Sequence, residues 1–165
     1  MQSYEDVKML QDAEELADGV WQLVSQWDKF AKDTVAAQFV RAADSVGANI
    51  AESYGRFHYG EKIQFLYYAR GSVFETKYWL NRALERKLIS TEAHRIHATR
   101  LTNIAKQING FAQHLKMRRY RGKSNSVLKE DGPVYRTFTD SAEDTIFAER
   151  HLTWIALHHD GDFSS

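Results

Sequence analysis

The sequence contains no cysteine, a single proline and no long apolar run. Without cysteine there can be no disulfide scaffold, thiolate metal site or cysteine nucleophile. The one proline is Pro133, so everything before it is free to be helical. No segment approaches the roughly 20 apolar residues that cross a bilayer, and the N-terminus MQSYEDVKML lacks the basic and apolar regions of a secretion signal. We therefore expect a cytoplasmic protein with no membrane partner.

The charge of the chain is balanced overall but unevenly distributed. Its 22 basic and 22 acidic residues cancel. By segment, residues 1–90 carry a net charge of −2, residues 91–123 carry +7 and residues 124–165 carry −5. The neutral total therefore conceals a strongly basic segment followed by an acidic tail.

The spacing of apolar residues predicts four helices within residues 1–122. We expect them at about 4–27, 34–55, 61–88 and 91–122, with Asp33 and Ser90 as N-caps of the second and fourth. The fourth has a heptad seam made of Leu101, Ile104, Ile108, Phe111 and Leu115. Short connections between long helices are typical of an all-α, antiparallel up-down-up-down four-helix bundle.

The third predicted helix is apolar on almost every side. A helix that only covers the core of its own bundle needs one apolar stripe, whereas this segment has three. The third stripe places Tyr67, Phe74 and Tyr78 around Gly71. We expect these three aromatic residues to form an interface between subunits of a homo-oligomer.

Residues 123–165 differ from the bundle in character. They begin as a polar linker with a turn at Asp131-Gly132-Pro133. Ser141, with Asp144 three residues later, has the spacing of a helix start. We expect a partly ordered acidic tail that contains one short fifth helix.

Polar residues interrupt the second and third predicted helices at helical spacing. They are Arg41, Ser45, Asn49, Glu52, Arg70, Ser72 and Glu75. They form either a polar site or a buried hydrogen-bond network that fixes helix register and subunit packing, and we favour the network because buried polar groups need partners. A pair between Glu75 and Arg41 or Arg70 would then be buried and charge-assisted.

No arrangement typical of catalysis or metal binding is present in the sequence. His94 and His97 are three residues apart, but none of the seven histidines follows a glutamate by three positions, as in bundle metal sites. There is no glycine-rich phosphate loop and no nucleophile motif. We expect no metal, no cofactor and no enzymatic activity.

Two segments together resemble a known bacterial family. They are RAADSVGANIAESYGR (residues 41–56) and FLYYARGSVFETKYWL (residues 65–80). They are similar to the four-helix-bundle proteins encoded by intervening sequences of large-subunit ribosomal RNA genes. The first motif is matched by Arg41, Ala43 or its neighbour Ala42, Ser45, Val46, Asn49, Ile50, Ala51 and Glu52, and the second by Ala69, Gly71, Ser72 and Glu75. Gly47 and Ser53 depart from it, where proline and glycine are common.

The resemblance covers about residues 5–120 and implies a left-handed bundle that assembles into a homopentameric ring. A diverged branch of the family comprises accessory proteins of diversity-generating retroelements, which bind nucleic acid and a reverse transcriptase. For most members the resemblance implies no known biochemical function.

The basic end of the fourth predicted helix is the main functional indication. Its cations are Lys116, Arg118, Arg119, Arg121 and Lys123, with Tyr120 among them. In a ring they would form a circle of positive charge suited to RNA or DNA phosphates. Alternatively, the cations favour the helix dipole and are neutralised by the acidic tail. A non-enzymatic, ring-forming accessory protein that binds RNA or DNA is one hypothesis, and an oligomeric scaffold that presents its tail to a protein partner is the other.

Overall fold

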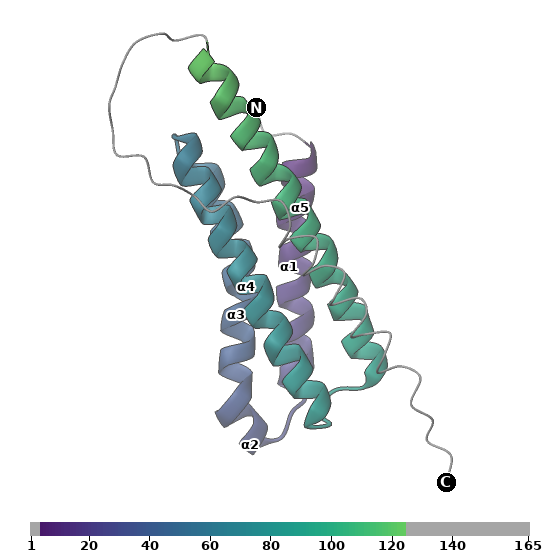
Figure 1. Ribbon diagram of the computed structural model, residues 1–165. Helices are drawn as coiled ribbons and strands as arrows, with labels where there is room; N and C mark the ends of the chain where they lie inside the picture. The colour runs from purple at the N-terminus through teal and green to yellow at the C-terminus, as the bar shows by residue number, and fades with distance from the viewer. Residues whose placement is uncertain (1–3, 125–165) are drawn as a thin grey trace. The chain divides into compact units, whose positions relative to one another are not determined.

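The computed structural model describes residues 4–124, with side chains described from 8 to 120. The elements are α1 (Tyr4–Ser25), α2 (Lys29–Ala31), the π-helical segment η1 (Lys32–Ala36), α3 (Ala37–Gly55), α4 (Tyr59–Glu85) and α5 (Thr91–Ser124). Because α2, η1 and α3 follow one another without a break, they form one continuous rod. Residues 4–124 thus contain four long helical rods and no strand (Figure 1).

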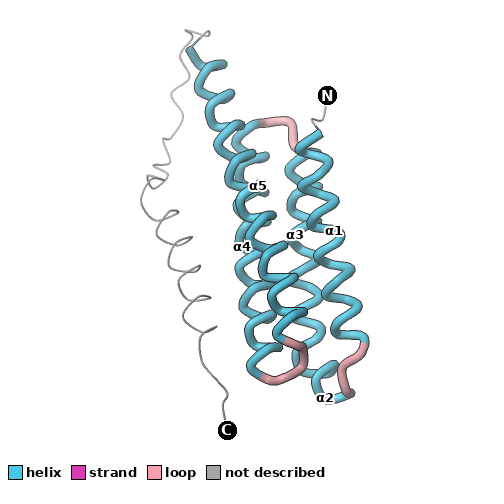
Figure 2. The backbone as a smooth tube through the Cα atoms, turned by 90° about the vertical axis from the view of Figure 1, so that its right-hand side faces the viewer, coloured by secondary structure: helices cyan, strands magenta, loops and turns pink. Residues whose placement is uncertain are grey.

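The four rods form the predicted antiparallel bundle. Figure 2 shows the chain running down α1, up α3, down α4 and up α5. The helix α3 packs against α1 and α4, and α5 closes the arrangement by packing against both α4 and α1. The prediction of an all-α, up-down-up-down four-helix bundle is confirmed.

Apolar residues from every rod fill the core. Its fully buried larger side chains include Met9, Leu16, Val20, Phe39, Val46, Ile50, Leu66, Leu80, Leu101, Ile104 and Ile108. In the predicted seam of α5, Phe111 is only half-buried and its neighbour Ala112 is buried instead. A straight helix drifts against a strict heptad repeat, which explains why the inward position shifts by one residue there.

The second rod begins earlier than expected. Asp28, not Asp33, is the N-cap, because its carboxylate accepts a hydrogen bond of 2.8 Å from the backbone N–H of Ala31. Asp33 lies inside η1 and pairs with Lys29 at 2.7 Å. The wide π-turn lets the neighbouring residues Val35 and Ala36 both face the core. The expected cap at Ser90 is confirmed, since its hydroxyl accepts from the N–H of Ala93 at 3.1 Å.

The two departures from the family motif fit the helix α3. Ser53 is fully buried, and its hydroxyl donates a hydrogen bond of 2.8 Å to the carbonyl of Ile50. A Cβ at Gly47 would meet the Cβ of Ala13 at an ordinary 3.8 Å, so this glycine is not required by close packing.

The helix ends also bear on the predicted domain boundary. The helix α3 ends at Gly55 as expected, whereas α5 continues through Gly122 to Ser124. The predicted tail begins at residue 123, but residues 123 and 124 belong to α5. The rest of the tail, with the predicted fifth helix, lies in residues 125–165, outside the described residues. Within the described part of the chain, no helix has the length and apolar character needed to pass through a bilayer.

Candidate nucleic-acid interface

The first half of α5 has its cations committed to contacts within the chain. The Arg95 guanidinium makes two hydrogen bonds to the carboxylate of Glu92, at 2.9 and 2.7 Å. Arg100 reaches α1, where it bonds the backbone carbonyl of Glu15 at 2.9 Å and pairs with the Glu15 carboxylate at 3.2 Å. These two cations are therefore neutralised locally.

The second half of α5 presents its cations to solvent. Figure 2 shows the last turns of α5 extending past the connection between α3 and α4. Arg118 and Arg119 are exposed there, and neither forms an ion pair with any residue in the described range. Tyr120 is 75% exposed beside them. Two cations and one aromatic ring are thus exposed together on the last turns of α5.

Two further cations contact the ring of Tyr67 on α4, close to the projecting end of α5. The Lys116 ammonium lies 5.4 Å from the centre of the Tyr67 ring, and the Arg70 guanidinium lies 5.6 Å from it. Arg70 also donates a long hydrogen bond of 3.4 Å to Asn109 on α5. The ring holds both cations by cation–π attraction, so the basic surface extends from the helix end onto the seam between α4 and α5.

The structure describes only part of the predicted basic set. It places Lys116, Arg118 and Arg119 together on the last turns of α5. Arg121 and Lys123 belong to the same helix, but their side chains lie outside the described part. Sequence reasoning missed Arg70 as a neighbour of this surface, because its contact with Asn109 joins residues 39 positions apart.

The predicted polar network does not form as one buried cluster within the chain. Asn49 donates to the Ser45 carbonyl at 2.8 Å and to the Ser72 hydroxyl at 3.4 Å. The second bond joins α3 to α4. Glu52 pairs with Arg56, and Arg41 bonds Gln38 at 2.5 Å. These are mostly local contacts on a helix surface, in which each side chain bonds a residue one turn away.

Glu75 forms neither of the ion pairs expected for it. Its side chain is exposed, and no described residue pairs with its carboxylate. Arg41 is exposed on α3, and Arg70 points to α5 instead. The expected buried pair is absent from the described chain because Glu75 lies on the outer face of α4 rather than on the face that packs against α3.

The aromatic stripe of α4 remains largely on the surface of the single chain. Phe74 and Tyr78 are 40% and 54% exposed, whereas Tyr67 is half-buried under its two cations. Tyr68, which the predicted interface omitted, is 52% exposed. The helical spacing could have placed Tyr68 on the exposed face, since Tyr68 precedes Gly71 and Glu75 by one and two helical turns.

His94 and His97 of α5 serve packing rather than a shared site. The Nε2 of His94 lies 2.8 Å from the amide oxygen of Asn81 on α4. His97 is buried against α1, where a Cβ on Gly19 would come within 2.5 Å of its ring. Among the described residues, no three histidine, aspartate or glutamate side chains gather in a way that would hold a metal ion.

Lys77 is a buried cation that the sequence did not reveal. It is 8% exposed, and burial lowers the pKa of its ammonium to about 8. It lies seven residues after Arg70 and four before Asn81, so it faces α5 as they do. In the sequence, only the helical spacing of Lys77 from Arg70 and Asn81 would have indicated its burial.

The described part of the chain is an all-α four-helix bundle with an exposed basic end on α5. The sequence profile of the 23S rRNA-intervening sequence protein family matches residues 5–110. The chain belongs to this family.

A solved structure from Bacteroides thetaiotaomicron VPI-5482 has a similar fold. It is described as a protein of unknown function from the S23 ribosomal protein family. It is 24% identical, with a TM-score of 0.60 over 66% of this chain and 98% of that one. Among curated proteins, none matches the chain significantly. Neither family nor neighbour is described by an enzymatic activity.

Proposed function

We propose that this protein is a non-enzymatic, ring-forming accessory protein of the bacterial cytoplasm that binds RNA or DNA through the second half of α5. The observation that supports this most is the contrast along α5. Arg95 and Arg100 are used in ion pairs within the chain. Arg118 and Arg119 are exposed at the projecting end. A cation that already has a carboxylate partner adds little to phosphate binding, whereas a solvated cation releases phosphate counterions on contact.

The expected mode of binding follows from the chemistry of this surface. Arginine forms bidentate hydrogen bonds to phosphate, and Tyr120 offers one exposed face on which a base can stack. No helix-turn-helix or other groove-reading motif is present in the described chain, so base-edge contacts are not expected. The protein should therefore bind the backbone with little sequence preference.

Assembly would multiply this surface. One copy presents a small basic patch, but a ring places several copies of it around one axis, and linked sites bind far more tightly than separate ones. The ring proposal is supported by the homopentameric ring that the family resemblance implies, and by the exposed aromatic residues of α4, Tyr68 and Tyr78.

The test is a pair of matched variants. Arg118→Ala/Arg119→Ala/Arg121→Ala should weaken binding to a labelled single-stranded RNA and a DNA of the same sequence by about tenfold or more at low salt, because phosphate contacts are lost. The control, Arg95→Ala/Arg100→Ala, lies on the same helix and should leave affinity within about twofold. The slope of log affinity against log salt should fall in the first variant only. Equal binding by both variants and the wild type would contradict the proposal.

Removing residues 125–165 separates the second candidate function from the first. The segment 124–165 has a net charge of −5, so its deletion should strengthen nucleic-acid binding if it competes with phosphate. If instead the protein is a scaffold, the deletion should abolish binding to a protein partner such as a reverse transcriptase. It should then leave nucleic-acid affinity unchanged.

A further inference from the structure

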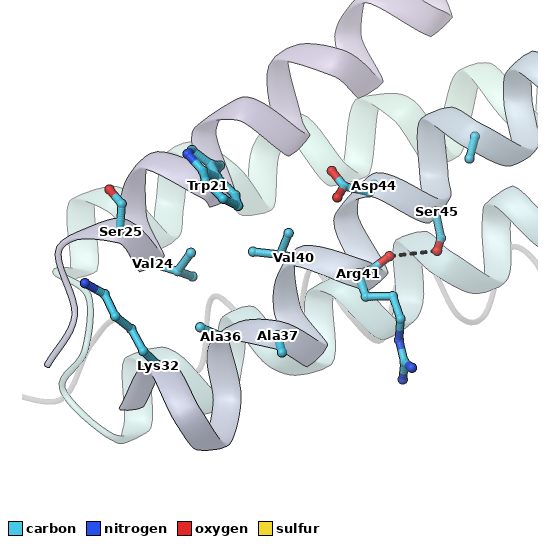
Figure 3. Close-up of a pocket in the computed structure, with 11 residues that line it drawn as sticks. Trp21, Val24, Ser25, Lys32, Ala36, Ala37, Val40, Arg41, Asp44 and Ser45 are labelled. Atoms are coloured by element: carbon cyan, nitrogen blue, oxygen red, sulfur yellow. Dashed lines mark hydrogen bonds between the residues drawn. The ribbon is translucent and has the colours of Figure 1, made fainter. Parts of the chain in front are cut away.

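An open groove of about 650 Å³ runs between α1 and the second rod, at the level of the π-turn (Figure 3). Small side chains of Ala36, Ala37 and Ala48, together with Val40, supply apolar surface. Trp21, which is 63% exposed, forms part of the wall. A large exposed apolar side chain next to an apolar hollow marks a surface that gains stability when another molecule covers it.

The groove lies beside the helix irregularity. At η1 both Val35 and Ala36 turn inward, and Ala37, the first residue of α3, is exposed. The lining residues that follow along α3 are Val40 and then Arg41. π-Helical turns are frequent at functional sites, and here Lys32 and Ala36 of the turn line the groove together with Ala37.

Charged groups border the groove unevenly. Lys32 and Arg41 contribute positive charge, and Asp44 contributes one negative charge. Lys32 has no ion pair in the described chain, and Arg41 bonds only the neutral amide of Gln38 there. The border is therefore positive on balance.

The helix α4 carries a ridge of matching character. Tyr68, Gly71, Glu75 and Tyr78 follow one another at spacings of three and four, so they form one row on the outer face of α4. Tyr68 and Tyr78 are about half exposed, and no atom lies within 4 Å of where a Cβ on Gly71 would sit. The exposed carboxylate of Glu75 lies between the two rings. The ridge is thus apolar with one negative charge, and the groove is apolar with a positive border.

We propose that the groove of one copy receives the α4 ridge of a second copy, with Glu75 of the ridge paired with Arg41 of the groove. This inference rests on the proposed ring and specifies how its subunits meet. Because the ridge lies on α4 and the groove between α1 and α3, the contact joins two different surfaces. Each copy then retains one unused groove or ridge, so the contact repeats head to tail and can close into a ring.

The occupant is a second copy because one chain supplies both complementary halves. The acidic group needed by the groove border is present on the ridge, and the rings needed to cover Trp21 flank it. Burying the Glu75 carboxylate in the contact without a partner would be unfavourable. The Arg41 guanidinium of the groove offsets this cost by forming an ion pair with it.

Two single variants test the contact by complementation. Ala37→Glu places a charge in the groove and leaves the ridge intact, whereas Tyr78→Glu damages the ridge and leaves the groove intact. Both residues are exposed in the single chain, so the fold should be retained. Each variant alone should weaken self-association about a hundredfold or more, because an unpaired charge would be buried in the contact. Size-exclusion chromatography with light scattering should then give the 19.1 kDa of one chain.

Mixing the two variants gives the decisive readout. The intact ridge of Ala37→Glu fits the intact groove of Tyr78→Glu, so the mixture should form a dimer of one copy of each and grow no further. Asn103→Glu, at an exposed position of α5, is the control and should assemble like the wild type. Glu75→Arg and Arg41→Glu should each weaken assembly, and the double variant should restore it.

The outcomes distinguish this inference from the function on which it rests. A multimeric wild type whose assembly survives Ala37→Glu and Tyr78→Glu would overturn the groove contact and leave the ring in place. Loss of assembly in Ala37→Glu but not in Tyr78→Glu would assign the groove to another occupant. A mixture that yields no dimer would also overturn it. A wild type that is a single chain at tens of micromolar would remove ring and contact together, while the Arg118 test of nucleic-acid binding would stand separately.

Discussion

The two halves of α5 belong to one helix but differ in what their side chains do. From Glu92 to Leu115 the helix is fixed by its buried seam and by bonds to α1, including the 2.6 Å hydrogen bond from Gln107 to Asp12. From Lys116 onward it has left the core, and Met117, Arg118, Arg119 and Tyr120 are exposed. Stability is therefore concentrated in the first half, and the second half is free to differ in surface chemistry without disturbing the fold.

The largest change in stability expected from this contrast comes from truncating a buried side chain of the core. Ile104→Ala in the first half removes a fully buried side chain and should lower the free energy of unfolding by about 2–5 kcal/mol. Met117→Ala, in the second half, truncates a side chain that is 58% exposed and should change it by no more than about 0.5 kcal/mol. Urea denaturation followed by circular dichroism measures both. Similar losses in the two variants would mean that the second half also contributes to the folded core.

Glycine substitutions sharpen the same contrast. In Gly19→Ala the new Cβ would come 2.5 Å from the His97 ring, so this buried ring or the helices around it must shift, at a cost of about 1–3 kcal/mol. Adding His97→Ala should recover part of this loss, because the clash is between these two residues.

The matched glycine control lies on the open side of α5. Gly110 has nothing within 4 Å of its Cβ position. Gly110→Ala should therefore be neutral or stabilising by up to about 1 kcal/mol through helix propensity. A Gly19→Ala protein as stable as the wild type would show that the α1–α5 contact is looser than described.

Lys77 offers a comparison between a buried and a solvated cation. Lys77→Met removes a charge whose pKa burial lowers to about 8, and it should raise the free energy of unfolding at pH 7 by roughly 1–3 kcal/mol. Below pH 8 the Lys77 ammonium is charged in both the folded and the unfolded protein, so the full cost of burying the charge lowers the stability of the wild type. Between pH 8 and the ordinary lysine pKa of 10.5, the folded state loses the Lys77 proton before the unfolded state does. The free energy of unfolding of the wild type should therefore rise relative to that of Lys77→Met over this range.

The control for Lys77 is the exposed Lys106 of α5. Lys106→Met should leave both the stability and its pH dependence unchanged. An advantage of Lys77→Met that stays constant between pH 8 and pH 10.5 would contradict the assigned burial.

The smallest expected effect is a pH dependence at His97. Burial lowers the pKa of this imidazole, and the nearby Arg100 and His94 add to the shift. Above about pH 6.5, His97 is neutral in both the folded and unfolded states. As the pH falls below that, the unfolded state takes up the proton first, so the wild type should lose stability relative to His97→Gln. Thermal melts from pH 7.5 to pH 5 measure this, and exposed His114→Gln should follow the wild type.

Sequence reasoning recovered the bundle because its evidence is local. Apolar spacing placed the core of all four rods, and the cap at Ser90 was identified from its residue type and position. The Asp28 cap was missed because Asp28 and Asp33 are equally good capping residues, and the π-turn between them has no distinct sequence signal. The candidate site was recovered in part. Lys116, Arg118 and Arg119 were found as a cluster, whereas Tyr67 beneath Lys116 was assigned only to an interface.

The sequence by itself determined the helices, their order and the excess of positive charge in α5, because each depends on residues within a few turns of one another. The tertiary structure alone decided which cations are neutralised. Arg100 meets Glu15 across 85 positions of sequence, and Lys77 is buried in the seam between α4 and α5. It also decided that Glu75 lies on an outer face and that alanines at the π-turn open onto a groove. The physical reason is that pairing and burial depend on which helix faces meet, and no pattern within one helix specifies its neighbour.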